Sequence, residues 1–378
     1  MRTRHSTILV FKTLLLLAIL LLGGLVLSGC TGVSTVPRGW SGGTIAADGT
    51  LYIGSMEGKL VAMDVVDGSQ LWAVPLEAPE SAGGGFGCAP APISIAIYGS
   101  PATAGDLVYV GGYNGKIYTI SSSTRLSKAK YLNDRDRKPI VGGPVVAGDS
   151  VYIGSSDGWV YALGAVSLDE QWKFETGNKI WSTPAIKGDT LFIGSFDKKL
   201  YALGATDGSQ KWEFLTAGAI VATPVVDNNT VYFGSFDRYL YAVDATDGTL
   251  KWKFLAENWF WAKPVIYDGA VYAASLDGKV YVFAGESGDK LAEFDLGSPV
   301  SSSPVLVGNS VVVATENGIV YALDTDNNQQ KQLANLEEKV YSSLAASQGI
   351  VYVHTAKDVL YAIDARSGAI RSFTLGSK

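Results

Sequence analysis

The chain repeats one pattern of hydrophobic and polar positions from about residue 40 to its C-terminus. Segment 231–254 shows the pattern most clearly, with the sequence VYFGSFDRYLYAVDATDGTLKWKF. Apolar and aromatic residues alternate with polar ones in three short runs, and aspartate and glycine stand between the runs. This alternation predicts short β-strands joined by tight turns.

The residue that opens each VYxGS-like run marks the period of the repeat. Successive marks are 57, 43, 40, 40, 40, 40 and 40 residues apart, which defines eight units. The marks are Leu51, Val108, Val151, Leu191, Val231, Val271, Val311 and Val351. Each unit contains four strand signals. The first is expected to end near a proline seven residues before the mark, with Thr44 and Leu344 at that place in the terminal units.

The turns of the unit carry a strong hairpin signal. Asn114-Gly115 and Asp157-Gly158 lie between the second and third strand signals, where both central residues need positive φ. Four antiparallel strands every 40 residues predict one propeller blade. The sequence therefore predicts an all-β, eight-bladed β-propeller of four-stranded antiparallel blades. A solenoid is less favoured, because neither end has a polar capping unit. The way in which the ring closes stays open.

The fourth strand signal contains a tryptophan in half of the units. These tryptophans are Trp72, Trp172, Trp212 and Trp252. We expect each to dock on the neighbouring blade and bury a large apolar surface. Units six to eight have Ala292, Gln332 and Ser372 there, so we expect looser outer contacts. The Asp-Gly turns are explained by turn chemistry and lack the alternating ligands of a calcium loop.

The first step of the repeat is longer than the others. The additional residues fall in segment 77–98, which is rich in glycine, alanine and proline and contains Cys88. Long loops in compact folds are usually functional or disordered, and both interpretations remain open. Cys88 is interpreted as a small loop residue rather than a reactive thiol.

The first 29 residues differ in kind from the repeat. A basic start with Arg2, Arg4 and Lys12 precedes an apolar run, and Leu27-Ser28-Gly29-Cys30 resembles a bacterial lipobox. We therefore predict a lipoprotein signal peptide over residues 1–29, lipidation of Cys30, a tether over 30–39 and the propeller over 40–378. The apolar run is short for an uncleaved membrane anchor.

Charge narrows the range of partners. The net charge of the whole chain is −6, and without residues 1–29, which carry three basic and no acidic residues, it becomes −9. An acidic body argues against nucleic acid as the main partner and against adsorption to anionic lipid. We expect the protein to contact the membrane through its N-terminal lipid anchor. With Cys30 lipidated, Cys88 has no partner for a disulfide.

The sequence contains no catalytic constellation that we recognise. Of the two histidines, His5 leaves with the signal peptide, so a nucleophilic site would need His354 as its base. His354 takes the place of Gly154, Gly194 and Gly234 in the repeat and is interpreted as a strand residue. No histidine or cysteine cluster predicts a metal site.

The connections between units carry the strongest candidates for binding. Three residues before the proline of the next unit lie Val141, Trp181, Val221, Trp261, Ser301 and Tyr341. Two residues earlier stand Lys179, Trp259 and Lys339, and Lys263 directly precedes its proline. Repeat packing does not require these residues, and tryptophan on a loop face is typical of a binding anchor. The candidate face for a partner or ligand is Lys179, Trp181, Trp259, Trp261, Lys263, Lys339 and Tyr341. The alternative is that Trp181 and Trp261 plug the channel.

The unit resembles the repeat of the PQQ-type β-propellers. The matching residues in unit five are Tyr232, Gly234, Tyr241, Ala242, Asp244, Ala245, Gly248 and Trp252. One branch of that family, the quinoprotein alcohol dehydrogenases, binds pyrroloquinoline quinone (PQQ) with calcium and usually pairs adjacent cysteines, which this chain lacks. Another branch is the lipoprotein propeller of the outer-membrane β-barrel assembly machinery, which is similar in length, lipobox and blade number.

This resemblance implies a non-catalytic scaffold without a cofactor. It would bind envelope proteins, with a role in outer-membrane protein assembly. The alternatives are a propeller that binds PQQ with calcium or another small ligand, as a degenerate enzyme, and a substrate-binding or sensory lipoprotein. We expect an exported, lipid-anchored protein, on the periplasmic face of the outer membrane in a cell with two membranes and otherwise on the outer face of the cytoplasmic membrane.

Overall fold

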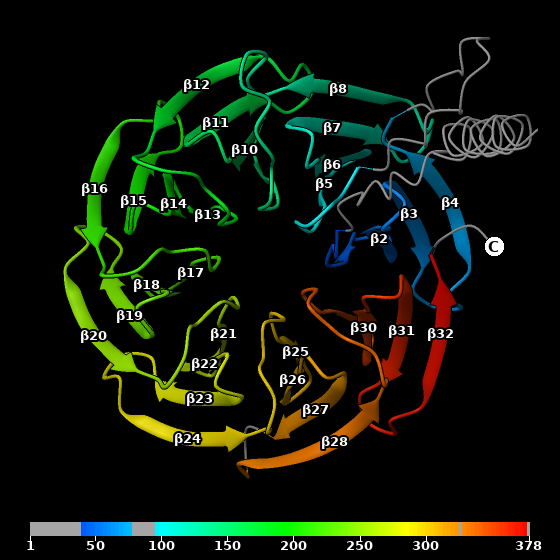
Figure 1. Cartoon of the computed structure of the whole chain (residues 1–378), viewed down its shortest axis with the longest axis vertical. Helices are drawn as coiled ribbons and strands as arrows, with labels where there is room; N and C mark the ends of the chain where they lie inside the picture. The colour runs from blue at the N-terminus through cyan, green and yellow to red at the C-terminus, as the bar shows by residue number, and fades with distance from the viewer. Residues whose placement is uncertain (1–38, 78–94, 325–326, 376–378) are drawn as a thin grey trace, which may run out of the picture. The chain divides into compact units, whose positions relative to one another are not determined.

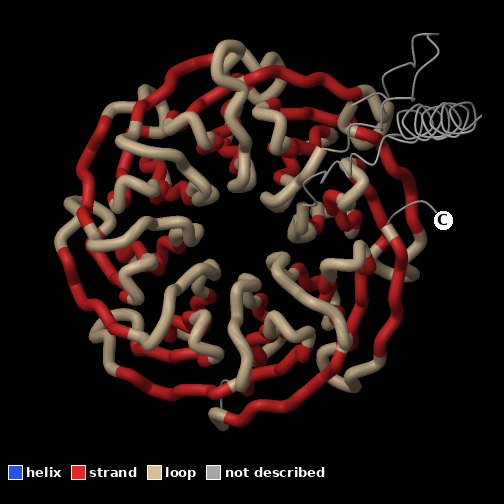
Figure 2. Tube along the Cα trace, in the orientation of Figure 1, coloured by secondary structure: helices blue, strands red, loops and turns tan. Residues whose placement is uncertain are grey.

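The computed structural model describes residues 39–77, 95–324 and 327–375, and these form eight four-stranded antiparallel sheets. The sheets follow one another around a ring, which confirms the predicted eight-bladed propeller (Figure 1). Figure 2 shows that strands and loops make up the whole described ring. In this part of the chain no helix is long and apolar enough to cross a membrane.

Each blade consists of four consecutive strands, the first nearest the axis and the fourth at the outside (Figure 1). Blades 1 to 4 comprise β1 (Thr44–Ile45), β2 (Thr50–Gly54), β3 (Lys59–Asp64), β4 (Gln70–Pro75), β5 (Ala102–Ala104), β6 (Leu107–Gly111), β7 (Lys116–Ser121), β8 (Ser127–Tyr131), β9 (Val145–Ala147), β10 (Ser150–Gly154), β11 (Trp159–Gly164), β12 (Glu170–Glu175), β13 (Ala185–Lys187), β14 (Thr190–Gly194), β15 (Lys199–Gly204) and β16 (Gln210–Leu215). Blades 5 to 8 comprise β17 (Val225–Asp227), β18 (Thr230–Gly234), β19 (Tyr239–Asp244), β20 (Leu250–Leu255), β21 (Val265–Tyr267), β22 (Ala270–Ala274), β23 (Lys279–Ala284), β24 (Lys290–Asp295), β25 (Val305–Val307), β26 (Ser310–Ala314), β27 (Ile319–Asp324), β28 (Gln329–Asn335), β29 (Ala345–Ser347), β30 (Ile350–His354), β31 (Val359–Asp364) and β32 (Ile370–Thr374).

The first strand of each regular blade was predicted in a slightly wrong position. It begins directly after the proline, as β13 does after Pro184, rather than ending near it. Proline has no N–H to give to a ladder, so it fits the entry to the strand better than the strand itself. The second and third strands are almost fully buried, whereas the fourth strand alternates between exposed and half-buried positions.

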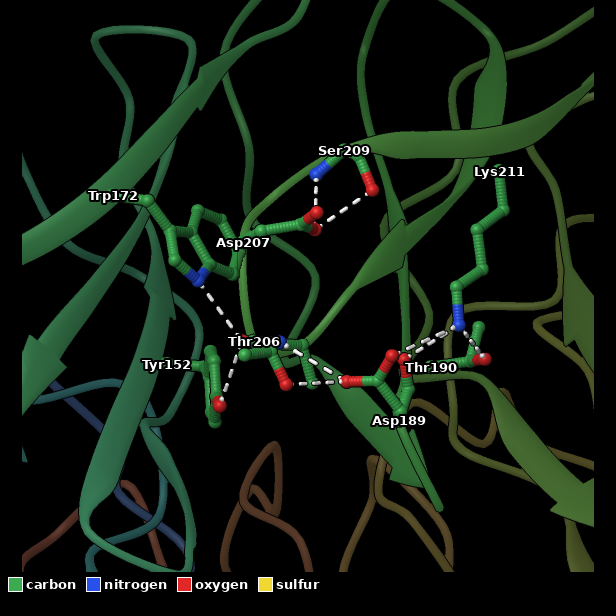
Figure 3. A network of polar contacts seen from close by, with 9 residues as sticks. Tyr152, Trp172, Asp189, Thr190, Thr206, Asp207, Ser209 and Lys211 are labelled. Carbon is green, nitrogen blue, oxygen red and sulfur yellow. Dashed lines mark hydrogen bonds and ion pairs between the residues drawn. The ribbon is translucent and has the colours of Figure 1, made fainter.

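In several blades the carbonyl that follows the third strand accepts a hydrogen bond from a tyrosine, a tryptophan or both on the blade before it. The Ala205 carbonyl of blade 4 accepts from the Tyr152 hydroxyl at 3.0 Å and from Trp172 Nε1 at 2.9 Å, both of blade 3 (Figure 3). Trp212 Nε1 donates to the Ala245 carbonyl at 3.1 Å, and Trp252 Nε1 donates to the Gly285 carbonyl at 2.7 Å. The prediction that these tryptophans dock on the neighbouring blade is confirmed.

The glycine of the third turn leaves room for that indole. A Cβ atom at Gly208 would lie 2.6 Å from the Trp172 ring, and Gly208 has φ of 71°. This glycine is therefore needed both for its backbone angle and for the ring of the blade before it. At the closing seam, where Ser372 stands in place of a tryptophan, the Phe373 ring lies against Gly68 instead.

The ring closes between two complete blades. Blades 1 and 8 each contain all four of their own strands, so no strand is exchanged between the termini. The predicted fourth strand at the C-terminus is β32. The Tyr352 hydroxyl of blade 8 donates to the Val65 carbonyl of blade 1 at 2.7 Å, and the Met56 amide of blade 1 donates to Asp358 Oδ1 at 3.0 Å.

His354 belongs to this closing seam. It is the last residue of β30 and is buried, with Nδ1 3.0 Å from the Ser41 carbonyl and Nε2 2.9 Å from Asp358 Oδ1. Both partners are oxygen atoms that accept hydrogen bonds, so each ring nitrogen has a polar partner at the seam. In blades 1 to 5 a glycine at this place packs against a large residue of the next connection, as Gly154 does against Ile180. Blades 6 and 7 have Ala274 and Ala314 there, and blade 8 has His354.

We predict that Trp212→Ala lowers the free energy of unfolding by about 3 to 5 kcal/mol, because the substitution removes a buried ring and the bond to the Ala245 carbonyl. Urea denaturation followed by circular dichroism measures this change. Trp259→Ala is the control: its side chain is 42% exposed, and we expect a loss below about 1 kcal/mol. Equal losses in the two variants would contradict the structural role of Trp212.

Candidate binding face and central cavity

The connections between blades and the turns between second and third strands lie at the same end of the blades, which we call the crossing face. Hydrogen bonds tie each connection to the blades on both sides. The Phe196 amide of blade 4 donates to the Lys179 carbonyl at 3.0 Å, and the Ile180 amide donates to the Ser155 carbonyl of blade 3 at 3.0 Å. The backbone that carries the side chains of these connections is therefore fixed by hydrogen bonds.

One residue from each of the seven connections, and one from the segment before blade 1, lie at equivalent places in the lining of a central cavity of about 930 Å³. These residues are Trp40, Tyr98, Val141, Trp181, Val221, Trp261, Ser301 and Tyr341. Trp181 and Trp261 are half-buried in its wall. Both indoles therefore face the central channel, as the binding interpretation and the plug interpretation both require.

Sequence analysis missed two members of this ring. Tyr98 lies three residues before Pro101, so the spacing rule was sufficient to find it. Trp40 was hidden because Thr44 was wrongly assigned to the place of the proline. Thr44 pairs with Tyr52 as Ala185 pairs with Phe192, so Gly43 takes the place of the proline, and the first turn of blade 1 is one residue longer.

Five aromatic residues form a continuous cluster on the crossing face, which we call the aromatic cluster: Trp181, Phe196, Phe236, Trp259 and Trp261. Phe236 stacks on Trp259 at 4.4 Å between ring centroids and on Trp261 at 5.5 Å. Trp181 meets Phe196 edge to face at 4.8 Å, and Phe196 lies 6.1 Å from Phe236. Phe196 and Phe236 were missed. The signal that could have found them is Phe in the Ser-Phe-Asp of units four and five, where other units vary.

The remaining predicted residues divide between two sides of the ring. The Lys179 ammonium lies 4.3 Å from the Trp181 ring centroid and 4.2 Å from that of Phe196, so it joins the aromatic cluster. Tyr341 instead contacts Trp40 at 5.2 Å, and Trp40 contacts Tyr98. Lys339 is exposed beside Tyr341. The predicted residues therefore belong to two aromatic groups beside one cavity. One is the aromatic cluster, and the other contains Tyr341 and Trp40.

Among the residues that the structure describes, Lys263 is the one cation in the lining of the cavity. It occupies a position that other connections fill with small or hydroxyl residues, such as Thr183 and Thr223. Its side chain reaches water inside the cavity, yet the walls enclose it, and this loss of hydration lowers the pKa of its ammonium. Among the described residues the ammonium has neither a hydrogen bond nor an ion pair.

The repeated aspartates of the second turns are engaged in the fold. Asp197 accepts from the Lys199 amide at 3.0 Å, from the Gly177 amide at 2.6 Å and from the Tyr201 hydroxyl at 2.8 Å. Burial raises the pKa of Tyr201, and the hydrogen bond to Asp197 raises it further. The same Asp–Tyr pair recurs in blades 3, 5 and 6.

The described residues contain no group of three or more His, Cys, Asp or Glu that could hold a metal ion. The cavity lining supplies one cation, Lys263, and one carboxylate, Asp227. This set of groups fits a small anion better than calcium, which takes six to eight oxygen ligands. Cys30, Cys88 and most of the 77–98 insertion lie outside the described residues.

Two family models match the chain. One is described as the β-propeller of the β-alanine-activating enzyme and matches residues 150–378, and the other is described as outer membrane protein assembly factor BamB and matches residues 28–124. No curated protein matches the chain.

Two solved structures resemble the propeller. The crystal structure of BamB from Moraxella catarrhalis has a TM-score of 0.67 at 21% identity, covering 89% of this chain and 95% of that one. The computationally designed Ika8 protein has a TM-score of 0.70 at 14% identity, covering 89% of this chain and 96% of that one. At these identities the likeness shows the fold alone.

We predict that Lys263 reacts with an amine reagent at lower pH than exposed lysines do, because its lowered pKa leaves more neutral amine at a given pH. Acetic anhydride labelling at about pH 8, read by peptide mass spectrometry, measures this. Lys339 on the same face is the control. Labelling of Lys263 that needs a higher pH than labelling of Lys339 would contradict the enclosure of its ammonium.

Proposed function

The chain belongs to the PQQ-type β-propeller family, through the group described as the β-propeller of the β-alanine-activating enzyme, and on this premise we propose that it is a non-catalytic scaffold. It binds a protein partner through the crossing face. The observation that carries the proposal is Trp259, which is 42% exposed and yet ordered by stacking on Phe236. An exposed aromatic side chain that is already held in place loses little entropy on binding.

The geometry of the aromatic cluster supports a protein partner. Tryptophan and tyrosine are enriched among the residues that dominate the energy of protein interfaces. The cluster joins the connections into blades 4 and 6 through Phe196 and Phe236. A partner strand or peptide that crosses blades 4 and 5 would meet several aromatic rings in a row.

The site of action in this proposal is the cell envelope. The lipobox sequence at Leu27 to Cys30 supports export and lipidation, with residues 1–29 as the signal peptide and 30–39 as the tether. The match to outer membrane protein assembly factor BamB over residues 28–124 supports a role in outer-membrane protein assembly. In a cell with two membranes the protein then sits on the periplasmic face of the outer membrane.

The test is a pull-down from solubilised envelopes of the source cell with the Trp259→Ala, Trp261→Ala double variant. We expect recovery of the partners bound by the unchanged chain to fall about tenfold or more, because two anchors are lost. Leu126→Ala is the control, since Leu126 is 74% exposed and lies beside the turn that joins β7 to β8, away from the crossing face. Unchanged recovery with the double variant would count against this face.

A second candidate function rests on the central cavity. Its volume of about 930 Å³ lies within the range of small-molecule sites, and Trp261 and Lys263 together offer a ring and a charge for an anionic planar ligand. Titration of PQQ, with and without calcium, against tryptophan fluorescence tests this candidate. Binding predicts quenching at about 1 μM ligand that weakens in Lys263→Ala. Absence of quenching in the unchanged protein would exclude it.

A further inference from the structure

Two neighbouring blades carry cations at a backbone position that favours glycine. The turn between second and third strands has a residue of positive φ in every blade. It is glycine in five blades, namely Gly58, Gly115, Gly158, Gly278 and Gly318, with φ from 76° to 92°. Blades 4 and 5 have Lys198 and Arg238 instead, with φ of 74° and 73°. Residues with a side chain pay about 1 kcal/mol or more in this conformation.

The fold gives no reason for these two cations. The third exception, Asp358 in blade 8, has a structural role, because it contacts His354 and the Met56 amide at the closing seam. Lys198 and Arg238 are exposed, and their side chains form no hydrogen bond or ion pair with the described residues. By contrast the neighbouring Lys199 pairs with Glu213 at 2.6 Å.

The nearest carboxylates of the same turns are already engaged. Asp237 accepts from the Tyr239 amide at 3.0 Å, from the Ala217 amide at 2.9 Å and from the Tyr241 hydroxyl at 2.7 Å. Asp197 in the turn of blade 4 is bonded in the same way. These bonds direct both carboxylates into the turn. Lys198 and Arg238, each two positions after a phenylalanine, extend from the surface.

Lys198 and Arg238 flank the aromatic cluster. Lys198 is two residues after Phe196, and Arg238 is two residues after Phe236. Lys179, whose ammonium lies over Trp181 and Phe196, adds a third cation that has no carboxylate partner within the described parts of the chain. A basic and aromatic surface thus covers blades 4 and 5 of a chain whose net charge is −6.

We propose that this surface binds an acidic segment of the partner protein, in which carboxylates alternate with aromatic or large apolar residues. Lys179, Lys198 and Arg238 receive the carboxylates, and Phe196, Phe236 and Trp259 receive the apolar side chains. Complementary charge steers and selects such a segment. The inference rests on the proposed function, because it uses the same face, and it adds the chemistry of the partner.

The flanking blades limit the extent of the surface. Blades 3 and 6 have Gly158 and Gly278 at the position of Lys198 and Arg238, and the Glu257 side chain between blades 5 and 6 is 79% exposed. The cations at this turn position are therefore confined to two blades, with an exposed carboxylate beside them. Such a bounded patch matches a short segment rather than an extended anionic membrane.

The decisive variant is Lys198→Gly with Arg238→Gly. Glycine already stands at this position in five blades, so we expect the thermal stability of the variant to be equal or higher.

The probe is a short synthetic peptide that alternates Glu with Phe, and the comparison peptide has Lys in place of Glu. We expect the Kd of the acidic peptide to rise about tenfold in the double variant and to rise with salt in the unchanged protein. The control is Lys187→Gln with Arg366→Gln, which removes equal charge from the opposite face.

The outcomes separate this inference from the proposed function. An unchanged Kd in the glycine variant, with binding lost in Trp259→Ala, overturns the acidic partner and keeps the face. Loss in the glycine variant with no effect of Trp259→Ala supports the acidic partner and overturns the aromatic anchor. Equal binding of the basic peptide, no binding of the acidic peptide at about 1 mM, or preferential binding of phosphatidylglycerol vesicles overturns the inference.

Discussion

The propeller depends on the hydrogen bonds by which one blade holds the next at its outer edge. The Ala205 carbonyl accepts from the Tyr152 hydroxyl and from the Trp172 indole of the preceding blade (Figure 3), and the Ala245 and Gly285 carbonyls each accept from one indole. The indole also fills the space above a turn glycine. Each blade alone would leave one sheet face exposed, so the stability of every blade is tied to its neighbour.

Because the blades are fixed at their outer edges and by the bonds of the connections, the crossing face is free to vary. Each connection buries a few residues, such as Ile180 and Ser182, and its other positions face the cavity or solvent. Trp259 and Lys263 occupy such positions, and Lys198 and Arg238 occupy exposed positions in the turns between second and third strands. Binding residues can therefore vary at these positions, because hydrogen bonds hold the backbone there and the strands of the blade stay unchanged.

The closing seam shows what a ring requires that a linear repeat does not. Blade 8 must pack against blade 1, although no connection of the chain joins these two blades directly. The contact is made by polar bonds, in which His354 and Asp358 of blade 8 bind the Ser41 carbonyl and the Met56 amide. His354, which the sequence suggested was only a strand residue in a degenerate last unit, therefore has a role in closing the ring.

The sequence by itself determined the blade count, the strand order within a blade and the docking of the tryptophans. These features follow from the 40-residue period, from the alternation of apolar and polar residues and from the turn glycines. All three signals can be read from neighbouring residues within one unit or from its repetition. The tertiary structure alone decided that Phe196 and Phe236 join Trp181 to Trp261, that Trp40 belongs to the cavity ring and that His354 serves the seam. Each of these contacts brings together residues from different blades, and their distance in space depends on the curvature of the ring and the register of a turn.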